Sequence, residues 1–130
     1  MNINFQTNII KSPNDHREYK YIKLPNELQA LIISDKRSPL ASVSLTINVG
    51  SFQENNIHGI AHFLEHMLFL GSEKYPDEDL FQKFVTKHGG VSNAYTAGDH
   101  SCFFFTIQPS FLEQGLDIFG QFFIKPSFDS

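Results

Sequence analysis

The residues of this chain best suited to chemistry are three ionisable side chains, His62, Glu65 and His66, in the spacing His-x-x-Glu-His. At 3.6 residues per helical turn, the two histidines would lie one turn apart on nearly the same face of a helix. Glu65 would project beside them. Two imidazoles so placed can hold one zinc ion, and a flanking carboxylate can take a proton from water. The spacing therefore predicts a zinc site with its own general base.

The same three residues could instead form a solvated polar face on an ordinary helix. The residues around them argue against this alternative, because most are apolar: Ile60, Ala61, Phe63, Leu64, Met67, Leu68 and Phe69. A helix with so many apolar positions is expected to be buried, and unpaired charge is costly to bury. A metal site gives the three ionisable groups a physical reason to be there.

A third histidine, His58, lies one helical turn before His62 and could be mistaken for another ligand. The helical rise would place it about 12 Å from His66, too far for one ion to reach both. We therefore interpret His58 as a residue of the helix start or a partner of the ligands.

The elements that must position the motif follow from hydrophobic periodicity and from turn residues. The expected strands are 19–24, 27–34, 41–49, 91–96 and 101–108, and the expected helices are 58–69, 77–88 and 110–124. The order βββααββα indicates an α+β fold, with an antiparallel-rich sheet and helices packed on one face. Residues 1–18 are polar and are expected to form a lead-in to the domain of residues 19–130.

Composition excludes several classes of partner. The 130 residues carry a net charge of −4 without a Lys/Arg run, which argues against nucleic acid. No run reaches the roughly 18–20 apolar residues that a membrane span needs. The single cysteine, Cys102, lies in an apolar segment, so we expect a buried thiol and a reducing compartment. The N-terminus has no signal-peptide pattern, and the cytoplasm is the expected location.

Phenylalanine is unusually frequent, with 14 Phe and no Trp, and many of these Phe occur after residue 100. Core packing is the expected role of most of them. Some would belong to an apolar surface that the rest of a parent chain, or another subunit, covers.

Beyond the motif, the chain resembles the insulinase (pitrilysin-like) family of zinc metallopeptidases, most closely its insulin-degrading enzyme group. The motif itself is the inverzincin signature of such enzymes. The matching segments are 49–51, 58–71, 75–76, 88–90, 92–96, His100 and 122–123. The resemblance covers the chain from about Tyr19 onward.

The resemblance implies particular roles for the motif residues. His62 and His66 would be two zinc ligands, and Glu65 would activate water. The third ligand of the family is a Glu on a later helix, which by spacing is expected beyond Ser130. The chain would then be an N-terminal fragment of the catalytic domain, inactive by itself.

The resemblance also implies substrate-binding residues. Asn93, Ala94 and Tyr95 would form an edge strand that receives an extended peptide. Phe69, together with Ala94 and Tyr95, would line a hydrophobic pocket for a substrate side chain. Exposed strand edges do accept peptides through main-chain hydrogen bonds, although an ordinary edge strand would have the same sequence.

We therefore expect a zinc-dependent metalloendopeptidase that hydrolyses peptides or small proteins. The alternative is a non-catalytic peptide-binding or scaffolding module of the same fold, against which the intact motif argues. A structural zinc would need four protein ligands, and the chain offers no obvious set.

Overall fold

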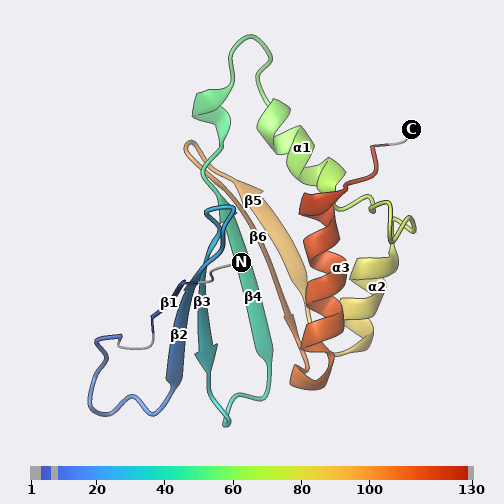
Figure 1. Ribbon diagram of the computed structural model, residues 1–130. Coiled ribbons are helices and arrows are strands. Elements are labelled where there is room, and N and C mark those ends of the chain that lie inside the picture. The colour runs from blue at the N-terminus through green and yellow to red at the C-terminus, as the bar shows by residue number, and fades with distance from the viewer. Residues whose placement is uncertain (1–3, 7–8, 129–130) are drawn as a thin grey trace. The chain divides into compact units, whose positions relative to one another are not determined.

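The computed structural model describes residues 4–6 and 9–128 (Figure 1). The chain divides into two compact units, Met1–Ser38 and Pro39–Ser130. Each unit contains one three-stranded antiparallel sheet. The α+β class predicted from the sequence is confirmed, with the strands divided between two small sheets.

The first unit is built from β1 (Asn4–Gln6), β2 (Glu18–Lys23) and β3 (Gln29–Ser34), in that order across the sheet. Strands β2 and β3, which pair as a hairpin, correspond to the strands predicted at residues 19–24 and 27–34. Strand β1 was not predicted from the sequence, because three residues are too few to establish a period-2 pattern. This strand lies within the polar lead-in and pairs with β2.

The second unit contains the remaining elements. They are β4 (Ala41–Ile47), α1 (Ile60–Leu68), α2 (Leu80–Lys87), β5 (Ser92–Thr96), β6 (Ser101–Ile107) and α3 (Leu112–Ile124). Single 3-10 turns at Ser51–Gln53 and Pro109–Phe111 join some of them. Their order is the predicted one, with element ends differing by a few residues. No helix in the described part of the chain has the length and apolarity to cross a bilayer.

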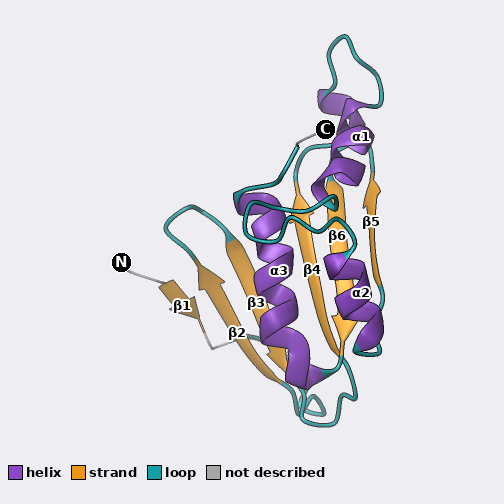
Figure 2. Cartoon of the chain, turned by 90° about the vertical axis from the view of Figure 1, so that its right-hand side faces the viewer, coloured by secondary structure: helices purple, strands orange, loops and turns teal. Residues whose placement is uncertain are grey.

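The sheet of the second unit has the order β4-β6-β5, so β6 is central and β5 lies at an edge. Helices α2 and α3 cover one face of this sheet, as Figure 2 shows. Strand β6 contributes Phe103, Phe105 and Ile107 to the core beneath those helices. The edge position of β5 leaves one side of its backbone without a strand partner among the described residues.

Phenylalanine rings form the centre of this core. Phe105 is fully buried, and its ring centroid lies 5.4 Å from that of Phe81 on α2 and 5.2 Å from that of Phe119 on α3. The buried phenylalanines are Phe81, Phe103, Phe105, Phe119 and Phe122. Phe111 and Phe123 pack against this core, so core packing is confirmed for six of the eight Phe after residue 100, while Phe128 is 51% exposed.

Cys102 is buried on β6, as predicted for a cysteine in an apolar strand. Its Sγ lies 3.4 Å from the Ser44 hydroxyl on the neighbouring strand β4. The thiol is therefore enclosed by the sheet instead of lying in an open cleft.

The core assignment predicts a large difference between two chemically identical substitutions. Phe105→Ala should lower the free energy of unfolding by about 3–5 kcal/mol, because it leaves a cavity between β6 and two helices. Phe128→Ala, at an exposed position, should change it by only about 0.5 kcal/mol. Urea denaturation of both variants measures this. Equal losses would contradict the assignment.

Candidate metal and catalytic site

Helix α1, which carries the motif, begins at Ile60 and ends at Leu68. Gly59 is its N-cap residue and has a φ of 87°, in the left-handed region where glycine is favoured. The predicted helix of residues 58–69 was therefore slightly too long, and His58 lies before the helix. The motif residues all fall within the helix, as the spacing required.

The expectation that α1 is buried is wrong for the described chain. Ile60, Phe63 and Leu64 are 48%, 64% and 47% exposed, whereas Glu65 and Leu68 are buried. The helix packs on β5 through the side that carries the buried pair. Ala61 and Met67 are half-buried, while no described residue lies close enough to Ile60, Phe63 and Leu64 to bury them.

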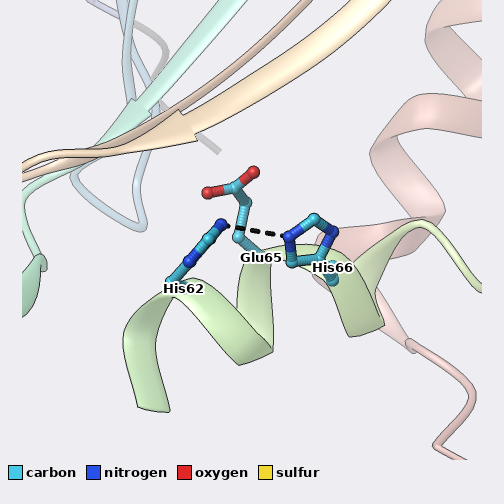
Figure 3. A group of neighbouring side chains, drawn as sticks. All are labelled: His62, Glu65 and His66. Atoms are coloured by element: carbon cyan, nitrogen blue, oxygen red, sulfur yellow. Dashed lines mark hydrogen bonds between the residues drawn. The ribbon is translucent and has the colours of Figure 1, made fainter. Parts of the chain in front are cut away.

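The three motif side chains converge on one point. The Nε2 atoms of His62 and His66 lie 3.0 Å apart, and the ring centroids are 4.7 Å apart. Figure 3 shows the two rings beside each other, with the Glu65 side chain pointing from the helix toward the strands. One ligand atom from each residue lies within 4.8 Å of the others. Within the described residues, this is the group of His, Cys, Asp and Glu gathered closely enough to hold a metal ion.

The donor set fits zinc. Two nitrogens bound to one tetrahedral zinc at ~2.0–2.1 Å each lie about 3.3 Å apart. The observed 3.0 Å between the Nε2 atoms is close to that separation. Both imidazoles are exposed on the same side of α1, so an ion could reach the two nitrogens without unfolding the helix.

Glu65 is held by a residue of β5. The Thr96 hydroxyl donates a hydrogen bond of 2.6 Å to Oε2 of Glu65, whose residue exposure is only 6%. A buried carboxylate is costly without such a partner. Thr96 thus fixes one carboxylate oxygen and leaves Oε1 for other contacts. Thr96 belongs to a segment that resembles the family, but this role was not predicted from the sequence.

A second buried carboxylate, Glu54, lies at the start of α1 and was missed by the sequence analysis. Its Oε2 accepts the N–H of Gly59 at 2.8 Å, and its Oε1 accepts the N–H of Ala61 at 3.0 Å. These two backbone donors hold the pKa of the Glu54 carboxyl below its ordinary value. Glu54 lies five residues before Gly59, outside any capping-box spacing, so no local signal indicates this contact.

Two hollows adjoin the motif. The first, of about 480 Å³, is lined by the motif residues, by the strand residues Asn93 to Thr96, and by Ser51, Glu54 and Gly59. The second, of about 290 Å³, shares Glu65, His66, Asn93 and Ala94 with the first. It extends along Phe69 and Leu70 to α2. The structure therefore brings all four predicted substrate-binding residues to the motif: Phe69, Asn93, Ala94 and Tyr95.

The backbone of β5 alternates between facing β6 and facing away. Hydrogen bonds from Thr106 N to Val91 O (2.8 Å) and from Ala97 N to His100 O (2.8 Å) mark the pairs that face β6. Because hydrogen-bonded and non-hydrogen-bonded pairs alternate along an antiparallel ladder, the backbone N–H and C=O of Ala94 face away from β6. Its N–H is accepted by Oδ1 of Asn93 at 2.9 Å. If the Ala94 N–H gave up the Asn93 oxygen and donated to a peptide carbonyl instead, a peptide could add to this edge as a strand.

The remaining histidines lie outside the cluster. The His58 side chain is 92% exposed, with its Nδ1 4.0 Å from Oε2 of Glu54. His88 is the C-cap residue of α2, and it stacks on Phe111. His100 pairs with Asp99 through Nδ1 and Oδ1, 2.6 Å apart.

Comparison with known proteins identifies the family. Residues 29–130 match the family described as Insulinase (Peptidase family M16). Because the match covers more than half of its residues, this chain belongs to the insulinase family.

Individual relatives agree with that assignment. The chain is 48% identical over 119 residues to "Insulin-degrading enzyme-like 1, peroxisomal" of Arabidopsis thaliana, covering 91% of this chain and 12% of the relative. It is 45% identical over 122 residues to the insulin-degrading enzyme of Homo sapiens, covering 93% and 12%. The relative named "Putative zinc protease mug138" of Schizosaccharomyces pombe is 44% identical over 119 residues, covering 89% and 12%.

The fold also matches a solved structure. The crystal structure of pitrilysin superposes with a TM-score of 0.91 at 32% identity, over 96% of this chain and 14% of that protein. The chain thus spans about an eighth of the length of the relatives that it matches.

The contact between Thr96 and Glu65 predicts a specific loss of stability. Thr96→Val keeps the side-chain shape but removes the hydroxyl, leaving a buried carboxylate oxygen without its donor. We expect the free energy of unfolding at pH 7 to fall by about 1.5–3 kcal/mol, as for hydrogen bonds to charged groups. Thr86→Val is the matched control, because the Thr86 hydroxyl is exposed and meets only the amide of Gln82. Urea denaturation with equal effects in both variants would contradict the role of Thr96.

Proposed function

We propose that this chain is the N-terminal portion of the catalytic domain of a zinc-dependent metalloendopeptidase that hydrolyses peptides or small proteins. The observation that carries the proposal is the convergence of His62 and His66, with Nε2 atoms 3.0 Å apart, beside the buried carboxylate of Glu65. Membership of the insulinase family and the zinc protease among the relatives support it.

In this proposal His62 and His66 hold zinc through their Nε2 atoms. When bound, zinc supplies a Lewis acid that polarises the scissile carbonyl and makes water more acidic. Two histidines do not complete a catalytic zinc site, which uses three protein ligands. We therefore place the third ligand outside the described residues.

Glu65 acts as the general base. Thr96 holds its Oε2, so we assign proton transfer to Oε1, which takes a proton from the attacking water and passes it to the leaving amine. Burial of Glu65 against β5 supports this role, because a carboxylate with restricted motion keeps one oxygen directed at the reacting atoms.

The substrate in this proposal binds as an extended strand along β5. The backbone of Ala94 would pair with the peptide, and Asn93 and Tyr95 would flank it, since these residues border the hollow beside the motif. A substrate side chain would enter the second hollow, against Phe69 and Ala94. The relatives named as insulin-degrading enzymes support a peptide substrate.

Two features outside the site complete the proposal. The exposed side chains of Ile60, Phe63 and Leu64 on α1 are proposed to be covered by the rest of a parent chain or by another subunit. The free, buried thiol of Cys102 supports a reducing compartment such as the cytoplasm.

Substitutions of the motif in the full-length protein test this proposal. Glu65→Gln should lower kcat for peptide hydrolysis by about 10²–10⁴-fold, because the base is lost, while zinc content stays normal. His62→Ala should lose both zinc and activity. Peptide cleavage and metal analysis of the same preparations provide the two readouts, with Glu18→Gln on β2 as the control.

Two results would contradict the proposal. Normal hydrolysis by Glu65→Gln with full zinc content would remove Glu65 from the role of base. Normal zinc content in His62→Ala would show that His62 is not a ligand and that the metal binds at another site.

A further inference from the structure

Helix α1 has no capping side chain of its own. Its N-cap residue is Gly59, and its first turn contains no acidic residue. The first N–H groups of a helix have no partner within it, and a helix of nine residues frays easily at such an end. His62 is the third residue of α1, so it lies in the turn most exposed to fraying.

Glu54 supplies the missing cap from outside the helix. Its two oxygens accept the N–H groups of Gly59 and Ala61, at 2.8 and 3.0 Å. The negative charge of Glu54 also interacts favourably with the positive end of the helix dipole. The Glu54 side chain is only 4% exposed, so water competes little for these bonds. Glu54 is not among the side chains gathered closely enough to share an ion with His62 and His66, so we assign it to the helix.

The segment that carries Glu54 is in turn fixed to the loop between β5 and β6. Ser51 N donates to Ala97 O at 3.0 Å, and Phe52 N donates to Gly98 O at 2.7 Å. Gly50 fits tightly there, because an added Cβ would lie 2.3 Å from Ala97 O. Residues 50–54 thereby connect the β5–β6 loop to the start of α1.

Thr96, at the end of β5, positions Glu65 from the same region. Helix α1 is therefore attached to the end of β5 at two points. Glu54 attaches its first turn, and Thr96 attaches its middle. His62 lies between these two points of attachment. Without the attachment through Glu54, the backbone of His62 would be held only by the hydrogen bonds of the helix.

We propose that Glu54 is a positioning residue of the metal site: it fixes the first turn of α1 and so holds His62 where its Nε2 and that of His66 can share one ion. This inference rests on the proposed zinc function. It assigns part of the metal affinity to a residue outside the His-x-x-Glu-His motif.

Zinc affinity and backbone exchange together test the role of Glu54. We would measure zinc dissociation constants of the purified full-length protein by competition with a chromophoric chelator, at a temperature where all variants are folded. Glu54→Ala should weaken zinc binding about 10-fold, the lower end of the loss usual when a residue supporting a metal ligand is removed. Glu54→Gln, which keeps the shape and one carbonyl oxygen, should give a smaller loss. Glu18→Gln, the same change at an exposed strand position, should bind as the wild type does.

Amide hydrogen exchange of the metal-free protein provides a readout that does not depend on zinc. Glu54→Ala should speed exchange in the first turn of α1, notably at Phe63, whose N–H bonds Gly59 O at 2.9 Å. Exchange in the core strand β6 should stay unchanged, which separates local fraying from general destabilisation. If Glu54→Ala does not fold, the same comparison is made with Glu54→Gln.

The outcomes separate this inference from the proposed function. Zinc binding by the wild type, lost in His62→Ala but equally tight in both Glu54 variants, would overturn the role of Glu54 alone. Unchanged exchange at the start of α1 would also overturn it. A wild type that binds zinc no better than His62→Ala would overturn the proposed function, and the inference with it.

Discussion

The site depends on the attachment of one short helix to the end of an edge strand. The hydrogen bond from Thr96 to Glu65 joins α1 to β5 at the point where the carboxylate must be held. The helix places His62 and His66 one turn apart on the same side, so the contact that attaches α1 to β5 also places these two residues at the end of β5. Loss of this hydrogen bond is costly, because it would leave the buried charge of Glu65 without a partner.

The rest of the second unit keeps that attachment rigid. The core of aromatic rings between β6 and the helices α2 and α3 holds the sheet, and the sheet holds β5 at its edge. One side of β5 is occupied by β6, while Ala94 on that strand faces the other way. The same strand thus orients the carboxylate of the motif and offers backbone groups to a peptide. This shared use explains why the two hollows meet at Glu65 and Ala94.

The sequence predicted those parts of the fold and the site that depend on local spacing. The convergence of His62 and His66 follows from the helical period, whereas the edge position of β5 was expected from the resemblance to the family. The role of Glu54 could not be predicted, because its partners are backbone N–H groups brought near by a loop. The exposure of α1 was mispredicted for a related reason: apolar composition shows that a side chain can be buried, but not which part of a protein covers it.

Zinc-edge anomalous scattering from crystals of the zinc-loaded protein tests the central claim most directly. The account predicts one strong anomalous peak, ~2.0–2.1 Å from the Nε2 atoms of both His62 and His66. The peak should disappear in His62→Ala crystals grown in the same way. A peak at another group of side chains, or one that persists unchanged in His62→Ala, would contradict the account.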